Sequence, residues 1–349
     1  METMKAVVFY GPGNMKYEDV PRPQPKEGEV CVKVRFASIC GSDIEEYKIG
    51  SDRSIPPLIF GHEFSGEIVE VGQGVSKERI GQRVSVNPIL YCGQCYYCKN
   101  GLINLCNHRR SVGRTLGVEK KRCDGGFAEY VCVPEFSLVP LADEVSLEEG
   151  ALLEPLAVSY CAAKASSFAP GENVLVIGTG PIGLMIIQFL KALGSGKIVA
   201  TDVVDMRLQA ARGCGADEAV NVKTTPIERV IDYTAGIGFD RVIVTAGAPS
   251  AVSDSLKLVR NGGSIVLVAL IRTGVTVNPV DIVGRQLTVY GSYMFTHEMV
   301  EVMNYLAKKK LNLQRLITSK CSLADTPEAF KRLASGTSND IKILIEVTE

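Results

Sequence analysis

The segment Asn173-Val-Leu-Val-Ile-Gly-Thr-Gly-Pro-Ile-Gly183 joins a short apolar run to a glycine-rich turn and the start of a predicted helix. In such a strand–turn–helix unit Gly178 permits the tight turn, Gly180 lets backbone approach a pyrophosphate, and Gly183 allows close helix–strand packing. The N–H groups at the helix start favour phosphate. The segment therefore predicts a dinucleotide site at the edge of a parallel α/β sheet.

Asp202 ends the next apolar run, Ile198–Thr201. A carboxylate at this place can accept both ribose hydroxyls of NAD and would repel the 2′-phosphate of NADP. Val203 and Val204 follow without a basic residue, so NAD is the preferred cofactor. Arg207 is expected along the adenosine and keeps NADP as an alternative. The simpler interpretation of Asp202 is a turn-forming acid at a strand end.

The second half of the chain repeats this rhythm of apolar runs and helices. Helices are predicted over about 182–193, closed by Gly194, and over about 298–309. Pro181 and Ile182, at the start of the first helix, are expected to contact the cofactor together with the three glycines. Alternating strands and helices predict a doubly wound parallel sheet, the α/β class. The apolar runs are Val174–Ile177, Ile198–Thr201, Val242–Val244, Ile265–Val268 and Leu287–Tyr290. The last helix should bury Met299, Val302, Met303 and Leu306.

Residues 1 to about 150 show a different pattern, with many glycines and prolines between short alternating segments. Alternation of apolar and polar residues is typical of half-buried strands and predicts an antiparallel, barrel-like domain. The clearest such segments are Glu29–Phe36, Ser65–Val71 and Gly126–Val133.

Length and charge limit the function classes. The 349 residues are enough for about two domains. With 38 basic and 39 acidic side chains the net charge is −1, which gives no general reason to bind nucleic acid or a membrane surface. The longest apolar stretch, Val174–Leu190, is broken by glycine and proline and is too short to span a bilayer. No signal-peptide core follows the first residues, so we expect a cytoplasmic protein.

Four of the eleven cysteines lie within fifteen residues, at Cys92, Cys95, Cys98 and Cys106. Four thiolates in this C-x2-C-x2-C-x7-C array can surround one tetrahedral zinc ion and leave no open position, which predicts a structural zinc site. An iron–sulfur cluster, a nucleic-acid-binding zinc ribbon and a chance group of buried cysteines are the alternatives.

A second metal site is suggested by Cys40, His62, Glu63 and Glu154 only when they are taken together. Alone, His62 reads as a structural histidine, Glu63 as a surface acid and Cys40 as a small core residue. The steps of 22 residues from Cys40 to His62 and 92 from His62 to Glu154 are too long for a local metal loop. The spacing of these residues therefore does not establish a metal site.

Over nearly its whole length the chain resembles the zinc-dependent medium-chain alcohol dehydrogenases, and most closely their polyol branch, typified by sorbitol dehydrogenase. The matching pieces are Cys40-Gly-Ser-Asp43, Gly61-His-Glu-Phe-Ser-Gly66, the four-cysteine segment, Gly125-Gly-Phe-Ala-Glu-Tyr130, Glu154-Pro-Leu-Ala157 and the Gly178–Gly183 turn. The resemblance implies a GroES-like β-barrel catalytic domain over 1–154 and 291–349, with a zinc lobe at about 90–107. It implies a Rossmann NAD-binding domain over 155–290.

The resemblance also implies that Cys40, His62 and a carboxylate hold a catalytic zinc ion, with one position left for substrate or water. The carboxylate is Glu63 or Glu154. This fits the chemistry, because an alcohol must lose its hydroxyl proton before its carbon releases hydride. Zinc lowers the pKa of bound water from ~16 to about 7 and should act similarly on an alcohol.

Ser42 matches the family position whose hydroxyl relays the alcohol proton; otherwise it is an ordinary turn serine. Many relatives continue the relay with a histidine, where this chain has Glu45. Proton release through water or Glu45 is therefore expected.

Further cofactor contacts follow from family segments that border the nicotinamide and substrate. They are Ala246, Val268, Ala269, Leu270 and Tyr293. Sorbitol dehydrogenases carry arginine where this chain has Met294, and galactitol-phosphate dehydrogenases match better there. A basic stretch is either a receiver for a substrate phosphate or a solvated or subunit-facing loop. It comprises Arg109, Arg110, Arg114, Lys120, Lys121 and Arg122.

The leading hypothesis is a zinc- and NAD-dependent dehydrogenase that oxidises a secondary alcohol of a polyol or cyclic sugar alcohol to a ketone. Polyol-phosphate, 2,3-butanediol and L-threonine dehydrogenases are the enzymatic alternatives. A catalytically inactive structural or regulatory member is the alternative from another class. Two zinc ions per chain are expected, and the family resemblance implies a homo-oligomer, a tetramer or a dimer.

Overall fold

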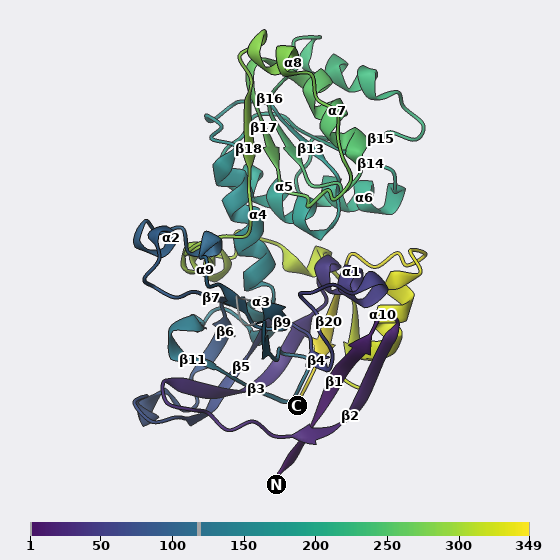
Figure 1. Ribbon diagram of the computed structural model, residues 1–349. Coiled ribbons are helices and arrows are strands. Elements are labelled where there is room, and N and C mark those ends of the chain that lie inside the picture. Colours follow the sequence, from purple (N-terminus) through teal and green to yellow (C-terminus); the bar gives the residue numbers. More distant parts are fainter. Residues whose placement is uncertain (1, 117–119, 349) are drawn as a thin grey trace. The chain divides into compact units, whose positions relative to one another are not determined.

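The structure is a computed structural model that describes residues 2–116 and 120–348. The chain forms two compact units. The first comprises Met1–Pro155, Met299–Lys308 and Ile317–Glu349, and the second Leu156–Glu298 and Lys309–Leu316. The C-terminal segments thus belong to the first unit (Figure 1). The domain limits expected from the sequence, 154/155 and 290/291, stay predictions.

The second unit is built on a six-stranded parallel sheet with the strand order β15-β14-β13-β16-β17-β18. Its strands are β13 (Val174–Ile177), β14 (Ile198–Asp202), β15 (Glu218–Asn221), β16 (Phe239–Val244), β17 (Val259–Leu267) and β18 (Thr288–Gly291). The predicted α/β class and parallel sheet are confirmed. Because all strands run in one direction, their carboxyl ends share one edge of the sheet.

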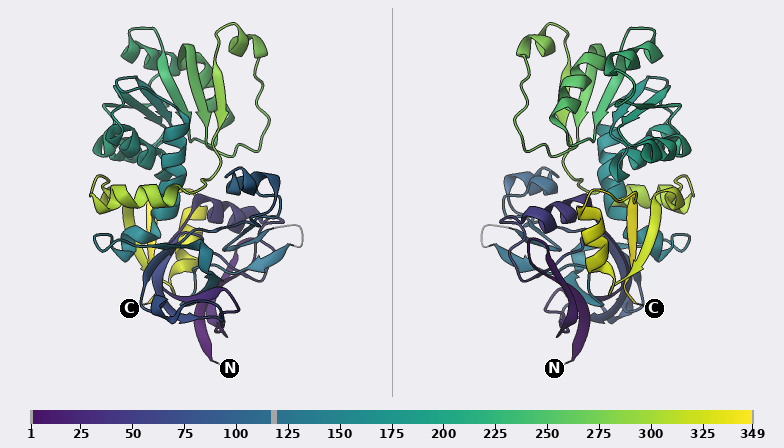
Figure 2. Two further views of the ribbon diagram at one scale, coloured as in Figure 1. Left: turned by 90° about the vertical axis from the view of Figure 1, so that its left-hand side faces the viewer. Right: turned by 90° about the vertical axis from the view of Figure 1, so that its right-hand side faces the viewer.

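Helices α5 (Pro181–Ala192), α6 (Asp205–Cys214) and α7 (Pro249–Leu258) pack against this sheet (Figure 2). The unit also contains α8 (Pro279–Val283) and most of α4 (Leu153–Ala165). The helix predicted over 182–193 is α5. Its long apolar face is buried, since every residue from Gly183 to Leu190 is inaccessible or nearly so.

The first unit contains a seven-stranded sheet with the order β12-β6-β5-β3-β20-β19, in which β11 also pairs with β3. A three-stranded sheet, β2-β1-β4, and two short ribbons, β10-β9 and β7-β8, complete its strands. The strands are β1 (Thr3–Gly11), β2 (Asn14–Pro21), β3 (Glu29–Ser38), β4 (Leu58–Ile59), β5 (Phe64–Val71), β6 (Arg83–Val86), β7 (Ile89–Leu90), β8 (Arg110–Ser111), β9 (Arg114–Leu116), β10 (Lys121–Cys123), β11 (Tyr130–Pro134), β12 (Leu138–Pro140), β19 (Ile317–Ser322) and β20 (Lys342–Glu346). The helices are α1 (Gly41–Ile49), α2 (Tyr96–Lys99), α3 (Leu147–Ala151), α9 (Glu298–Ala307) and α10 (Thr326–Ala334).

The hydrophobic core of this unit lies on one face of the central strand β3, to which alternate residues of the strand point. Val30, Val32 and Val34 point into the core, together with aromatic side chains such as Phe60 and Phe127. The helix predicted near 298–309 is α9, and it buries the four apolar residues expected of it.

One predicted strand is shorter than expected. Strand β11 begins only at Tyr130, so of the predicted segment Gly126–Val133 only Tyr130–Val133 lies in a strand. The backbone of Gly126 and Phe127 instead donates to the carbonyls of Gly61 and Phe60, at 2.8 and 3.0 Å. No helix in the described part of the chain is long and apolar enough to cross a membrane.

Candidate catalytic and structural metal sites

The four cysteines of the segment from Cys92 to Cys106, here called the lobe, lie together in the first unit. Cys95 caps helix α2, Cys98 lies within it, and Cys106 follows a short 3-10 turn. All four Sγ atoms lie within 4.8 Å of one another. The Cys92–Cys98 and Cys95–Cys98 sulfur pairs are 3.9 and 3.5 Å apart. Sulfurs at about 2.3 Å from one tetrahedral zinc ion are about 3.8 Å apart, so the lobe fits zinc.

Backbone N–H groups point at the lobe sulfurs. Cys92 Sγ accepts from Cys95, and Cys106 Sγ accepts from Cys92 and His108, each at 3.4 Å. The N–H of Cys98 is the main cause that lowers the pKa of Cys95 to about 6. Burial raises the pKa of Cys98, and neighbouring thiols raise it further. Burial also raises the pKa of Cys106, although the N–H groups of Cys92 and His108 partly offset this rise. A cation is therefore needed before all four sulfurs become thiolates, which is the form that binds metal.

A second group, here called the mixed cluster, consists of Cys40, His62 and Glu63. Cys40 caps the N-terminus of α1, and the other two residues directly precede β5. The Cys40 sulfur, a His62 ring nitrogen and a Glu63 carboxylate oxygen all lie within 4.8 Å of one another. The fold thus brings together a thiol, an imidazole and a carboxylate, a ligand set that zinc accepts.

Asp43 and Arg114 form a buried charge pair behind His62. Asp43 Oδ1 lies 2.6 Å from Arg114 Nη2 and 3.4 Å from His62 Nδ1, and the Asp43 side chain is fully buried. Burial raises the pKa of Asp43, but the Arg114 and His62 charges outweigh it and hold this pKa well below its usual range. Because Nδ1 of His62 faces Asp43, Nε2 is the nitrogen left for a metal ion, the usual arrangement around a ligating histidine.

Glu63 is held at one oxygen and free at the other. Its Oε2 accepts hydrogen bonds from Ser38 Oγ and Lys342 Nζ, which are both buried. Its Oε1 is buried and has no hydrogen-bond partner among the described residues. A buried acceptor without a partner is costly, and a zinc ion in the mixed cluster would satisfy it. The mixed cluster therefore fits a metal ion on its own chemistry.

Glu154, the other predicted carboxylate, lies at the start of α4 and outside the mixed cluster. Burial is the largest cause that raises its pKa to about 7; Glu63 raises it further and His62 lowers it. These charge interactions place Glu154 near both residues. The structure brings Glu63, rather than Glu154, within ligand distance of Cys40 and His62.

Ser42 lies beside the mixed cluster, where the resemblance predicts it. Its hydroxyl donates to Cys40 Sγ at 3.3 Å and accepts from Arg114 Nη2 at 2.9 Å. Glu45 lies half-buried on the same helix, α1. Ser42 is thus oriented by the buried guanidinium of Arg114, which was not predicted from the sequence to lie here.

Four residues of this site escaped sequence analysis in their observed roles. Asp43 could have been predicted in part, because an acidic residue three positions after a helix cap can accept a hydrogen bond from the backbone N–H of the cap. Asp43 accepts such a bond from Cys40 N–H at 3.2 Å. A lysine in the apolar strand Lys342–Glu346 was a weaker signal. Nothing marked Ser38. Arg114 was expected in a basic stretch that receives a substrate phosphate or forms a solvated or subunit-facing loop. The solvated interpretation is wrong for Arg114, because its side chain is only 3% exposed and pairs with Asp43.

The rest of the basic stretch lies elsewhere. Lys120 pairs with Asp52 and Arg122 with Asp124, at 3.3 and 2.8 Å. Arg110 and Arg122 line a cavity of about 480 Å³ whose lining contains no member of the mixed cluster. The phosphate-receiving role of this stretch stays a prediction.

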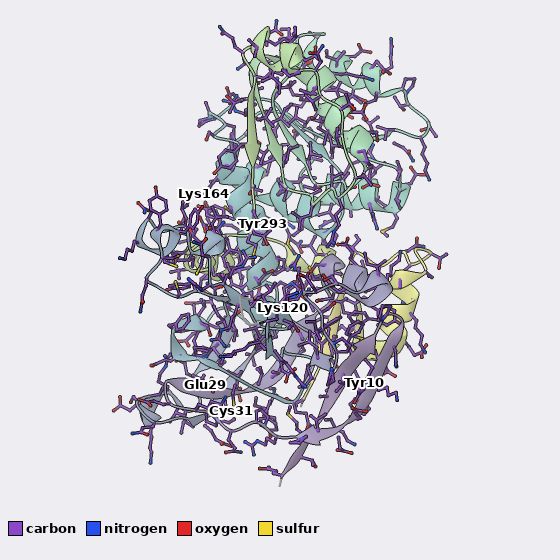
Figure 3. All side chains as sticks on the ribbon, in the orientation of Figure 1. Tyr10, Glu29, Cys31, Lys120, Lys164 and Tyr293 are labelled. Carbon is purple, nitrogen blue, oxygen red and sulfur yellow. The ribbon has the colours of Figure 1, made fainter. Side chains whose placement is uncertain are left out.

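The predicted cofactor residues gather at the carboxyl edge of the parallel sheet. Gly178 follows β13, Asp202 ends β14, Ala246 follows β16, Val268, Ala269 and Leu270 follow β17, and Tyr293 (labelled in Figure 3) follows β18. Arg207 lies half-buried on α6, which follows β14. Val268 and Ala269 both donate to Val244 O, at 3.0 and 3.2 Å, which fixes their backbone beside β16.

The glycine turn has the geometry that a pyrophosphate loop requires. Gly178 has φ +100°, and a Cβ on Gly183 would lie 2.1 Å from the Gly178 carbonyl oxygen, so neither place accepts a side chain. Open space surrounds the corresponding point on Gly180, which caps α5 ahead of Pro181 and Ile182. Backbone there is accessible to a phosphate.

Asp202 is tied to this turn. Its Oδ2 accepts from the N–H and hydroxyl of Thr179, at 2.7 and 3.0 Å, and its Oδ1 accepts from Val203 and Val204. These bonds fix the carboxylate beside the glycine turn. The structure thus brings the predicted ribose acceptor and phosphate loop together.

Comparison with known proteins identifies the family of the chain. Residues 26–143 match the alcohol dehydrogenase GroES-like domain, and residues 181–308 match the zinc-binding dehydrogenase domain. The chain is 32% identical to sorbitol dehydrogenase of Bacillus subtilis, over 99% of this chain and 97% of that protein. It is 35% identical to D-arabitol-phosphate dehydrogenase of Enterococcus avium, over 99% and 98% of the two chains.

Solved structures lead to the same family. The alcohol dehydrogenase RspB from Escherichia coli CFT073, in complex with NADH, superimposes with a TM-score of 0.90 at 30% identity, over 99% of this chain and 100% of that one. The Rossmann-type sheet, the GroES-like domain and the relatives matched along the whole chain all identify the same protein family. The chain belongs to the zinc-dependent medium-chain alcohol dehydrogenases, in their polyol dehydrogenase branch.

Proposed function

We propose that the protein uses zinc and NAD to oxidise a secondary alcohol of a polyol or cyclic sugar alcohol to a ketone by hydride transfer. The mixed cluster carries this proposal. Its three ligands leave one position of a tetrahedral zinc ion open, as catalytic sites require, whereas the lobe supplies four and leaves none. Glu63 is proposed as the carboxylate ligand because of its unsatisfied Oε1, with Glu154 as the alternative.

A zinc ion in the mixed cluster would lower the pKa of a coordinated hydroxyl group, which favours loss of its proton. Ser42 is placed to take that proton, because its oxygen lies next to the Cys40 sulfur. Arg114 holds the Ser42 hydroxyl in this orientation, and Glu45 or water would receive the proton afterwards. Asp43 fixes the ring of His62, and Lys342 fixes the carboxylate of Glu63.

NAD is proposed as the hydride acceptor. The Asp202 side chain at the end of β14 favours two free ribose hydroxyls over a 2′-phosphate. Arg207 is the feature that would help NADP, so the two nucleotides must be compared directly. An Asp202→Ala variant should lose NAD preference if the carboxylate reads the ribose.

Absorbance of the reduced nucleotide tests the proposal. The zinc-loaded protein is mixed with NAD or NADP and a panel of polyols, cyclic sugar alcohols, diols, threonine and sugar phosphates, with and without a chelator. We expect chelator-sensitive NADH formation with a polyol or cyclic sugar alcohol. No reduction with any alcohol would favour the catalytically inactive alternative, and a clear preference for butanediol or threonine would replace the polyol as the proposed substrate.

A phosphorylated polyol is the second candidate, favoured by the 35% identity to an arabitol-phosphate dehydrogenase and by the Met294 match. Paired substrates decide between the two. A kcat/KM on the free polyol equal to or above that on its phosphate would remove the phosphorylated candidate.

A homo-oligomer, either a tetramer or a dimer, is also proposed. Support comes from β18, an edge strand of the parallel sheet whose Val289 and Tyr290 are 42% and 52% exposed. Val280 and Val283 on the preceding helix α8 are exposed as well. Edge strands with apolar side chains tend to pair with another chain, and light scattering after size-exclusion chromatography would give the number of chains.

A further inference from the structure

Two cysteines outside both metal sites face each other across a pair of strands. Cys31 on β3 lies directly opposite Cys132 on β11 in the antiparallel register. The flanking residues Val30, Val32 and Val131 point into the core. Because side chains alternate between the two faces of a sheet, both cysteines lie on the opposite face. Figure 3 labels Cys31 on β3.

The hydrogen-bond pattern shows what kind of pair this is. Val34 N–H donates to Glu129 O, and Glu135 N–H donates to Gly28 O, both at 2.9 Å. Hydrogen-bonded and non-hydrogen-bonded pairs alternate along antiparallel strands, so the Cys31–Cys132 pair is a non-hydrogen-bonded one.

Pro134 agrees with this alternation, because it lies opposite Glu29, two positions along, and has no N–H to give. Residues at non-hydrogen-bonded positions have Cα atoms about 4.5 Å apart. This spacing lies within the range that a disulfide spans, from about 4.4 to 6.8 Å. The backbone can therefore accept a Cys31–Cys132 disulfide without rearrangement of the strands.

The Cys31–Cys132 pair lies beside a cavity that is lined by charged residues. Cys31 is fully buried, but Cys132 is half-buried and lines the cavity of about 480 Å³. The charged lining of that cavity comprises Lys26, Arg110 and Arg122 with Glu29 and Asp124. Basic groups therefore outnumber acidic ones, which suits a small molecule that carries carboxylates.

Arg22 covers the same face of the sheet. Its guanidinium lies 4.2 Å from the centre of the Tyr130 ring and pairs with Glu70. Hydrogen bonding from Cys132 is the largest cause that lowers the pKa of Cys31, and the Arg22 cation lowers it as well, against burial. Cys31 is thus a more acidic thiol than an ordinary cysteine, and Cys132 is the more accessible of the two.

We propose that Cys31 and Cys132 form a reversible thiol modification site, which a small carboxylate-bearing organic disulfide enters through the cavity and oxidises to a cross-strand disulfide. The Cys132 thiolate attacks one sulfur of the small disulfide RS–SR, which forms a Cys132–SR mixed disulfide, breaks the S–S bond of RS–SR and releases one RSH, which carries the proton lost by Cys132. Cys31 then attacks Cys132, which forms the Cys31–Cys132 bond and releases the second thiol. The two cysteines lose two electrons and two protons, and both end on the two RSH molecules.

Glutathione redox buffers test this site on the zinc-loaded full-length protein. After equilibration in an oxidising and in a reducing glutathione buffer, free thiols are blocked in acid and peptides are identified by mass spectrometry without reduction. We expect a Cys31–Cys132 cross-linked peptide, with loss of both blockable thiols and their return on reduction. Zinc content measured alongside should stay unchanged.

Variants separate this site from general oxidation. Cys31→Ala should trap a mixed disulfide with glutathione on Cys132, whereas Cys132→Ser should give neither product. The matched control is Cys123→Ser, since Cys123 lines the same cavity and burial raises its pKa to about 11; the cross-link should persist in it. Free Cys31 and Cys132 at the oxidising potential, or a Cys132 cross-link to another cysteine, would overturn the proposal.

Discussion

The lobe and the mixed cluster are two candidate zinc sites of one unit, built in opposite ways. The lobe takes four identical donors from fifteen consecutive residues, and backbone N–H groups prepare its sulfurs. The mixed cluster takes three different donors from two segments, and buried side-chain charges on both sides hold them. A complete set of four ligands suits a structural site. An incomplete set held by buried charged side chains, here called the charged frame (Asp43, Arg114 and Lys342), suits catalysis.

The largest effect should come from the mixed cluster itself. Cys40→Ser replaces a zinc thiolate by a poor ligand, so kcat/KM should fall by about 1000-fold or more, which is ~4 kcal/mol of barrier. The thermal midpoint should change little, because the charged frame remains. Steady-state kinetics and differential scanning fluorimetry give the two readouts.

Cys321→Ser is the control for this substitution, since Cys321 is a half-buried thiol of the same unit outside both sites. It should keep full activity. A Cys40→Ser protein as unstable as a lobe variant would contradict the division into a catalytic and a structural site.

The charged frame should be the next most sensitive part. Arg114→Met leaves the fully buried Asp43 without its cation, which should cost about 3–5 kcal/mol of folding stability. Arg114→Lys keeps the charge but not the second bond to Ser42, so it should recover stability more than kcat. Denaturant unfolding and kcat of both variants test this, and equal stability of the Met and Lys variants would argue against a buried ion pair.

Disruption of the lobe should act on stability rather than chemistry. Cys95→Ser removes one of four ligands, so the lobe should lose its zinc and the thermal midpoint should fall by several degrees. The activity per folded molecule should stay within about tenfold, since no lobe residue belongs to the mixed cluster. Zinc content should fall from two ions per chain to one; unchanged content would reject the structural role.

The two sites also differ in how far the sequence foretold them. The lobe could be predicted completely because its ligands are close in sequence and their spacing is the signal. The core of the second unit was equally accessible, since the apolar runs of β13 and α5 have clear periodicity. Strand β15 was missed because only its middle residues, Ala219 and Val220, are buried.

The charged residues around the mixed cluster could not be predicted from the sequence, for a physical reason. Arg114 bonds Ser42 from 72 residues away, and Lys342 bonds Glu63 from 279 residues away. Such contacts depend on how β9 and β20 pack, and no local pattern records that. A charged residue in a short strand looks like a surface residue until its buried partner is known.

The smallest effect should come from Ser38→Ala, which removes one of two donors to Glu63 Oε2 while Lys342 keeps the other. A hydrogen bond to a charged group contributes about 1.5–3 kcal/mol. Since Lys342 retains the carboxylate, we expect a loss in kcat/KM of about tenfold or less and no loss of zinc. Ser85→Ala is the matched control, because Ser85 is an equally buried serine of the same sheet that bonds only the Phe64 carbonyl at 3.3 Å. If both substitutions lower kcat/KM equally, the loss reflects packing of the sheet; if only Ser38→Ala does, orientation of Glu63 limits turnover.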